Sequence, residues 1–200
     1  TPEGKTGARG KDWLKKMPLD MFEDAVAQCA SAGGLNVVNL EGSGEATLNA
    51  DLPLYIEIVK KYKARSYIFS NGFRMRGQFM QDCVDAGLDF FRFSVIGYNK
   101  DLYKTWMNSN NFDRVVQNLN EMQEYVQHTD AKTEVATYHL ILDNNNIDYE
   151  VAQYRKIVDN AGVHTEIWKM HNWSGVYNPE YSREGAKKTC GRPFSPDIVI

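Results

Sequence analysis

The sequence predicts an α/β fold in which parallel strands are joined by helices. Short apolar stretches of strand length alternate with longer amphipathic segments along the chain. The alternation repeats five times, with strand centres about 25 to 45 residues apart, which is typical of parallel strands connected by right-handed crossover helices. The composition fits a globular protein, since 42% of the residues are apolar, 12% are aromatic and no tract is of low complexity.

The first predicted helix follows Pro18. We expect Asp20 to cap it and Glu23 to complete a capping box, and two glycines at 33–34 to end it. Its apolar residues recur at helical spacing: Leu19, Phe22, Val26 and Cys29.

The remaining elements follow in strict alternation. A strand at 36–40 and a Gly-rich turn at 41–47 lead to a helix that Asp51 and Pro53 open and that runs through Tyr62. The other predicted strands are 66–70, 90–96, 134–142 and 165–170. The other predicted helices are 78–86, 112–128 and 149–161.

Two folds contain such a series, the doubly wound sheet and the (β/α) barrel. Polar residues alternate with apolar ones in the third, fourth and fifth strands, whereas a sheet covered on both faces would be almost continuously apolar. The alternating polar residues are Arg92, Ser94, Thr137, His139 and Glu166. A polar face favours an open or partial barrel whose inner side is wet.

Composition and charge exclude several classes of function. With 26 acidic and 23 basic residues, the net charge of -3 provides no broad basic surface for nucleic acid. The longest apolar runs are far shorter than the ~20 residues that a membrane span needs. Cys29, Cys83 and Cys190 are far apart in the sequence, so they form no metal knuckle or redox pair. We therefore expect a cytoplasmic protein without nucleic-acid or membrane partners.

Ligand sites in both candidate folds lie at the carboxyl ends of the strands. The loops there are 41–47, 70–73, 94–99, 142–146 and 169–174. In the first loop the glycines let backbone N–H groups approach a ligand, and Glu45 can accept from an ammonium group. Ser70, Asn71 and Ser94 add polar groups at the next two strand ends. Each feature alone is more typical of an ordinary turn, but together they indicate a small-molecule site.

Four segments resemble one enzyme family. LEGSGEATLNADL at 40–52 resembles the GGEPLLNPDL segment of radical S-adenosylmethionine (radical SAM) enzymes, and SNG at 70–72 resembles their TNG. FSVIG at 93–97 resembles SIDG, and FDRVVQNL at 112–119 resembles the F..V..NL helix. The order of these segments is more specific than any one of them. Ser43 and Ile96 depart from the family pattern, which usually has Gly and Asp there.

The resemblance implies a partial (β/α)6 barrel that lacks its first strand and cluster loop. By analogy, Ser43, Gly44 and Glu45 would bind the amino group of S-adenosylmethionine. The strand-end residues that would hold its carboxylate and ribose are Ser70, Asn71 and Ser94. Leu142 and Asn144 would lie near its adenine.

The family's [4Fe–4S] cluster is held by a CxxxCxxC motif, which this sequence does not contain. The resemblance places those cysteines upstream of Thr1, in a chain truncated there. CGRPF at 190–194 resembles the start of a SPASM or twitch extension, so Cys190 would ligate an auxiliary iron–sulfur cluster. The implied organisation is a radical SAM core over 1–175, followed by a linker and the start of that extension over 176–200.

The implied function is reductive cleavage of S-adenosylmethionine to a 5′-deoxyadenosyl radical, which abstracts hydrogen from a substrate. By resemblance the enzyme is an oxidoreductase or maturase that uses an electron donor and acts on a peptide or protein, and this chain alone would be inactive. One alternative is a lyase or aldolase with Lys169 as a Schiff-base lysine. Another is a non-catalytic, ligand-binding barrel.

No general acid or base is identified by spacing. The titratable candidates near strand ends are Arg92, His139, Glu166, Lys169 and His171. Each is expected to orient the substrate or support the fold rather than to react. Cys29 and Cys83 lie on the apolar faces of predicted helices, so both are expected to be small core residues.

Overall fold

The computed structural model describes residues 16–42, 44–143, 145–158 and 162–169. Five strands form one parallel sheet in the order β1-β2-β3-β4-β5. They are β1 (Val37–Asn39), β2 (Arg65–Ser70), β3 (Phe90–Ser94), β4 (Glu134–Ile141) and β5 (His164–Lys169). The α/β fold with parallel strands is therefore confirmed, and the sheet does not close into a barrel within the described residues.

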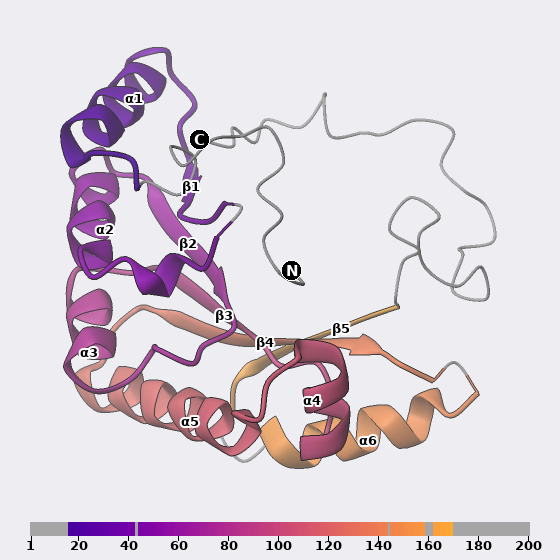
Figure 1. Ribbon diagram of the computed structural model, residues 1–200. Helices are drawn as coiled ribbons and strands as arrows, with labels where there is room; N and C mark the ends of the chain where they lie inside the picture. Colours follow the sequence, from indigo (N-terminus) through magenta and orange to yellow (C-terminus); the bar gives the residue numbers. More distant parts are fainter. Residues whose placement is uncertain (1–15, 43, 144, 159–161, 170–200) are drawn as a thin grey trace, which may run out of the picture.

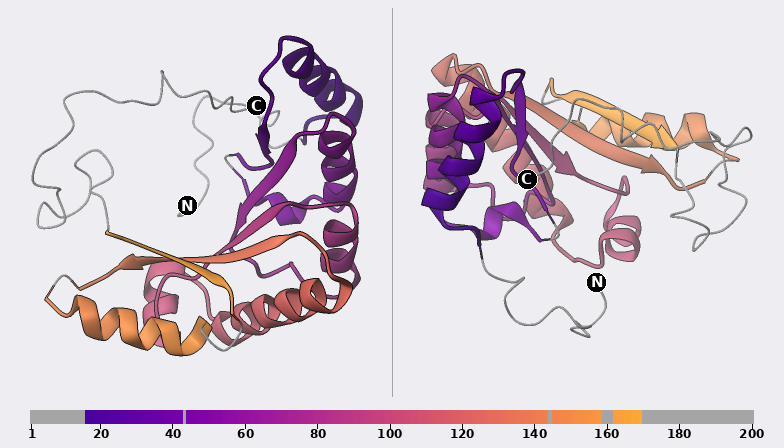
Figure 2. Two further views of the ribbon diagram at one scale, coloured as in Figure 1. Left: turned by 180° about the vertical axis from the view of Figure 1, so that it is seen from behind. Right: turned by 90° about the horizontal axis from the view of Figure 1, so that it is seen from above.

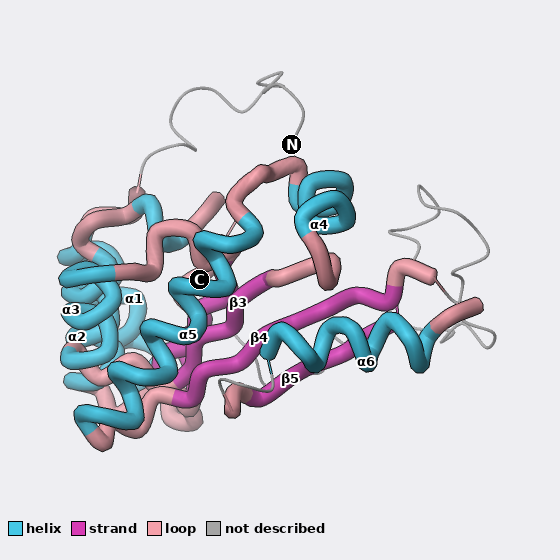
Figure 3. Tube along the Cα trace, turned by 90° about the horizontal axis from the view of Figure 1, so that it is seen from below, coloured by secondary structure: helices cyan, strands magenta, loops and turns pink. Residues whose placement is uncertain are grey.

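The helices lie on the convex side of this curved sheet (Figures 1 and 2). They are α1 (Leu19–Ser31), α2 (Leu52–Lys61), α3 (Gly77–Asp85), α5 (Phe112–Thr129) and α6 (Ile147–Val158). A sixth helix, α4 (Lys100–Met107), follows β3 and lies beyond the carboxyl end of that strand (Figure 3). None of the described helices covers the concave face, which is therefore where the chain can present polar groups.

The main hydrophobic core lies between the sheet and its convex helices. Ile68, Phe91 and Val135 project from neighbouring strands and pack against Leu119 and Tyr154 of the helices. All five side chains are at most 4% exposed. A second core joins α1, α2 and β1 around Phe22, Val26 and Tyr55. Because the convex face buries this much apolar surface, the strands are fixed in place with their carboxyl ends at one edge.

The helix–strand alternation is confirmed, with element ends that differ from the predicted ones by a few residues. The helix α4 is not expected from the hydrophobic pattern. Its signal is Asn99, whose side chain accepts a hydrogen bond from the backbone N–H of Leu102 at 2.9 Å.

The predicted capping box of α1 is wrong, whereas the predicted start of α2 at Asp51 and Pro53 is confirmed. The N-cap residue of α1 is Pro18, while Glu23 forms an ion pair with Lys61 on α2 instead of a capping box. Asp51 is the N-cap residue of α2, as expected, although its side chain is paired with Lys16 and makes no hydrogen bond to the helix backbone. Contacts between distant residues compete successfully with local caps here, since a cap contributes only about 1 kcal/mol.

The predicted polar face is correct for β3 and wrong for β4. Ser94 is in register with Tyr138, so Tyr138 shares the concave face with Arg92 and Ser94. Thr137 and His139 face the convex helices and are fully buried. They tolerate this position because each has a hydrogen-bond partner on α6.

None of the described helices is long and apolar enough to cross a membrane.

Gly72 supports the turn after β2 in a way that only glycine allows. Its φ is +71°, and a Cβ there would lie 2.1 Å from a ring carbon of Phe93. We expect Gly72→Ala to lower the free energy of unfolding by roughly 2 kcal/mol or more. Gly77→Ala is the matched control, since Gly77 also has positive φ but open space around it. Urea unfolding of both variants tests this, and equal losses would contradict the proposed close contact.

Candidate functional site

The carboxyl ends of β1 and β2 bring together three of the residues singled out from the sequence. Glu45 lies in the loop after β1 and points its carboxylate at the end of β2. Its Oε1 accepts from the Ser70 hydroxyl at 2.5 Å, and its Oε2 accepts from the backbone N–H of Asn71 at 3.1 Å. The loop containing the glycines is thus tied to the neighbouring strand through one carboxylate.

The two oxygens of Glu45 differ in how much acceptor capacity they retain. Besides the Ser70 hydroxyl, Oε1 accepts from the backbone N–H and the hydroxyl of Thr47, at 3.1 and 2.7 Å. Oε2 has one described donor, and a carboxylate oxygen accepts about two. Glu45 is half-buried. Its Oε2 therefore offers an oriented acceptor for one further donor, such as an ammonium group.

Ser70 and Asn71 act in the turn as well as on Glu45. The Ser70 hydroxyl accepts from the backbone N–H of Gly72 at 3.0 Å, and the Asn71 side-chain oxygen accepts from that of Phe73 at 2.9 Å. The buried side-chain amide of Asn118, on α5, donates to the backbone carbonyls of Gly72 and Phe73, at 2.8 and 2.9 Å. The turn is consequently rigid, and Ser70 positions Glu45.

A second carboxylate organises the other half of the edge, and the sequence analysis did not identify it. Glu150 of α6 is 2% exposed and accepts from the backbone N–H groups of Leu142 and Asp143, at 2.8 and 2.9 Å. It also contacts Nε2 of His139 at 2.8 Å. Since Nδ1 of His139 accepts from the backbone N–H of Gly97, its Nε2 carries the proton and donates to Glu150.

These contacts connect the end of β4 to the loop after β3. The structure thus supports the expectation that His139 has a structural role. Because Gly97 has a φ of +109° and lies against the first turn of α4, the same network holds α4 near the site.

Ser94 and Leu142 lie at the carboxyl ends of β3 and β4. Ser94 is half-buried on the concave face. Leu142 is 9% exposed and belongs to an apolar cluster contributed by β4, α4 and the loop before α4. The other members are Leu140, Tyr138, Ile96, Leu102 and Trp106. The edge is therefore polar at β1–β2 and apolar at β4.

Arg92 and Glu166, on β3 and β5, form an ion pair on the concave face with an Nη1–Oε2 distance of 2.8 Å. Lys169 is the last residue of β5 and is in register with Ile141; its side chain lies outside the described part of the structure. Ser43, Asn144, His171 and Cys190 also lie outside the described residues.

No group of three or more His, Cys, Asp or Glu side chains that could hold a metal occurs among the described residues. Cys83 is fully buried in the main core, as expected, and burial raises the pKa of its thiol to about 12. Cys29 is half-buried, so the expectation of a core position holds for it only in part. The described residues therefore do not provide ligands for an iron–sulfur cluster, which needs thiolates.

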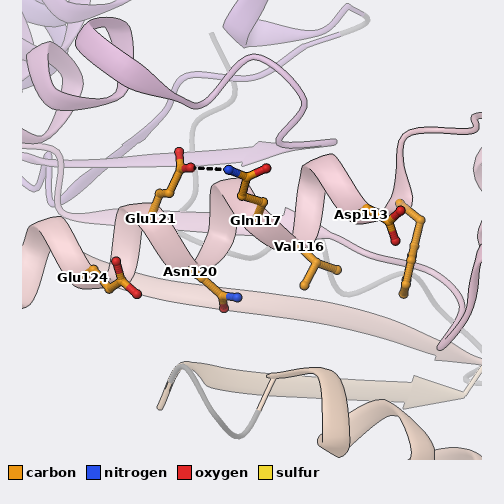
Figure 4. Close-up of a pocket in the computed structure, with 7 residues that line it drawn as sticks. Asp113, Val116, Gln117, Asn120, Glu121 and Glu124 are labelled. Atoms are coloured by element: carbon orange, nitrogen blue, oxygen red, sulfur yellow. Dashed lines mark hydrogen bonds between the residues drawn. The ribbon is translucent and has the colours of Figure 1, made fainter.

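The convex surface carries open depressions that do not include this edge. One of about 420 Å³ lies along α5 and is lined by residues that include Gln117 and Glu121, whose side chains are hydrogen-bonded at 2.7 Å (Figure 4). It is open to solvent and holds none of the strand-end residues, so the candidate site is the strand edge.

Glu150→Gln should destabilise the fold, because the introduced amide NH2 would face backbone N–H groups that need an acceptor. We expect a loss of about 1–3 kcal/mol in the free energy of unfolding, measured by urea denaturation. Glu124→Gln, on the exposed surface of α5, is the control and should change it by less than about 0.5 kcal/mol. Similar effects of both substitutions would contradict the proposed role of Glu150.

The two described cysteines should differ in reactivity. At pH 8 a thiol with a pKa of about 12 is almost entirely protonated and, in Cys83, has no access to solvent. Iodoacetamide should therefore label Cys29 in the native protein and Cys83 only after unfolding, as read by peptide mass spectrometry. Rapid native labelling of Cys83 would show that α3 does not pack as described.

Comparison with solved structures gives matches to longer proteins. Streptococcus suis SuiB, solved with S-adenosylmethionine, superposes with a TM-score of 0.62 at 12% identity, covering 82% of this chain and 36% of SuiB. Escherichia coli HemN, a coproporphyrinogen III oxidase described as a radical SAM enzyme, superposes with a TM-score of 0.58 at 12% identity. The match covers 80% of this chain and 38% of HemN. The chain thus spans well under half of either protein, and the likeness shows a shared fold.

A comparison with curated proteins gives no significant match. The family model of the radical SAM superfamily, however, matches residues 3–154, which include the loop of Glu45, the turn of Ser70 and the whole of β4. From this match over most of its length, the chain belongs to the radical SAM superfamily.

Proposed function

We propose that the protein containing this chain binds S-adenosylmethionine at the carboxyl edge of the sheet and uses it in radical chemistry. The observation that carries the proposal is that Oε2 of Glu45 has one donor among the described residues and can accept a second. The methionine moiety of S-adenosylmethionine carries an ammonium group, and a half-buried, oriented carboxylate is its natural partner. Superfamily membership supports the same assignment.

The other strand-end residues are proposed to surround the rest of the ligand. Ser43 and Gly44 would complete the loop around the amino group, and Asn71 and Ser94 would face the carboxylate and ribose. The apolar cluster that contains Leu142 supports a flat, uncharged neighbour such as adenine at the β4 end, and Asn144 would contact its edge. Ser70 would act through Glu45, since its hydroxyl already has two partners.

A [4Fe–4S] cluster, when bound, supplies the electron that cleaves S-adenosylmethionine to the 5′-deoxyadenosyl radical. Because the described residues lack a ligand set for it, we propose that its cysteines lie upstream of Thr1. An external electron donor would reduce it. The role of the described chain is to bind and orient S-adenosylmethionine and to keep water away from the reacting groups.

The substrate is proposed to be a peptide or protein, and the reaction an oxidation or maturation step. One of the similar structures is SuiB bound to its precursor peptide SuiA, which superposes with a TM-score of 0.59 at 13% identity. We further propose a core over 1–175 and a SPASM-like or twitch-like extension from 176, with Cys190 as a ligand of an auxiliary cluster.

Glu45→Gln in the full-length protein should weaken S-adenosylmethionine binding by about tenfold or more, because a hydrogen bond between charged groups becomes one with a neutral amide. Calorimetry measures the dissociation constant. Methylthioadenosine lacks the amino-acid part of the ligand, so its affinity should not change.

Glu57→Gln, on the exposed side of α2, is the matched control, and near-UV circular dichroism verifies that the fold is retained. Unchanged S-adenosylmethionine affinity in a folded Glu45→Gln protein would overturn the assignment. An equal loss for methylthioadenosine would show that the loop, and not the ammonium contact, had been damaged.

A further inference from the structure

Arg92 lies at the centre of the concave face among groups from four strands. Its guanidinium carbon is 3.8 Å from the ring centre of Phe69, 4.9 Å from that of Tyr138 and 5.2 Å from that of Trp168. Glu166 adds the ion pair described above. We call these five residues the Arg92 cluster.

The guanidinium uses only part of its hydrogen-bonding capacity. Among the described residues Glu166 is its one hydrogen-bond partner, through Nη1. Nε is buried and has no partner in the described structure. Nε and Nη2 point in nearly the same direction and form one of the two forked edges with which arginine binds a pair of oxygens. One edge of Arg92 is therefore committed to the protein and the other is not.

An unpaired donor in such surroundings is costly. The Arg92 side chain is 12% exposed, and the rings around it remove much of its hydration. Leaving a buried donor of a charged group without an acceptor costs more than leaving a neutral one. Burial also raises the pKa of Tyr138, so its phenol is neutral and does not balance the charge. The free edge is consequently suited to an acceptor that arrives from outside the described chain.

The chemistry of the neighbours restricts the class of acceptor. Glu166 already balances one positive charge, so a dianion such as a phosphate would add two uncompensated negative charges near its carboxylate. A carboxylate adds only one negative charge, and its two oxygens match the two N–H groups of the forked edge in shape. The rings of Phe69, Tyr138 and Trp168 provide apolar contact for the group that bears the carboxylate, and Trp168 is 46% exposed.

The cluster is set back from the proposed S-adenosylmethionine site. Arg92 precedes the last residue of β3 by two positions, which places its Cα about 7 Å from the strand end. Phe69 is its register partner on β2, directly before Ser70. A group held by Arg92 would therefore lie deeper on the concave face than a ligand held by Glu45.

We propose that the Arg92 cluster binds a carboxylate of the substrate, so that the substrate is an acidic molecule or a peptide with an acidic side chain or free carboxyl terminus. This inference deepens the proposed function and rests on it. The carboxylate of S-adenosylmethionine is the competing source of the same chemistry, and the experiment separates the two.

The test uses the full-length protein and three small probes of similar shape: benzoate, benzamide and phenylphosphonate. NMR titration gives their dissociation constants. Benzoate should bind at least about tenfold more tightly than benzamide and more tightly than phenylphosphonate. Arg92→Lys, which keeps the charge and loses the fork, and Arg92→Gln should both weaken benzoate binding by about tenfold or more. The control is Arg65→Gln, which removes an exposed arginine of β2 and should leave benzoate binding unchanged.

S-adenosylmethionine affinity is measured in the same variants. It should be unchanged, because the ligand's amino group is assigned to Glu45 and its carboxylate to the strand edge. Loss of S-adenosylmethionine binding in Arg92→Lys would overturn the inference in favour of the cofactor carboxylate. Benzoate binding that does not depend on Arg92 would overturn it outright. Absence of S-adenosylmethionine binding in the unmutated protein would instead contradict the proposed function.

Because Arg92→Gln leaves Glu166 without its partner, the fold of that variant needs a check. The double substitution Arg92→Gln, Glu166→Gln removes both charges and restores a neutral pair. Its ratio of unfolded to folded protein, obtained from urea denaturation, should lie within about twofold of the ratio for the parent protein. The double variant should still fail to bind benzoate. Retained benzoate binding in the double variant would contradict the inference.

Discussion

The candidate site depends on one constraint, which is that a single carboxylate joins the loop after β1 to the end of β2. Parallel strands end at the same edge, so the residues that follow them are brought near one another. Proximity alone does not orient a side chain. Thr47 and Ser70 fix Oε1 of Glu45, and the backbone N–H of Asn71 fixes the direction of Oε2. The remaining acceptor position is thereby aimed without further reorganisation, which is what tight binding of an ammonium group requires.

Glu150 joins α6 to the residues that follow β4, just as Glu45 joins the loop after β1 to the end of β2. It is almost fully buried, and burial of a charge is tolerated only with enough hydrogen-bond donors. Two backbone N–H groups and His139 supply them. Glu45 is half-buried and its Oε2 has one donor among the described residues, whereas Glu150 is almost fully buried and has three partners there. The difference in burial and in remaining acceptor capacity distinguishes Glu45, the proposed binding residue, from Glu150.

Much of the fold and the first half of the site followed from sequence, because the signals are local. Apolar runs and glycines locate the strands and turns, and Glu45, Ser70 and Asn71 come directly after strands. The rest could not be predicted because it depends on contacts between distant residues. Glu150 resembles any surface acid of an amphipathic helix until α6 packs on β4. Likewise, Thr137 and His139 alternate with apolar neighbours just as Arg92 does, and only the register between β3 and β4 shows that they face the helices.

The most direct test is a crystal structure of the full-length protein with S-adenosylmethionine, grown without oxygen. We predict that the ligand's ammonium nitrogen lies about 2.7–3.0 Å from Oε2 of Glu45, with Ser70 still hydrogen-bonded to Oε1. We also predict that the ligand's carboxylate does not contact Arg92. A ligand whose ammonium group lies away from Glu45, or whose carboxylate occupies the Arg92 cluster, would contradict these predictions.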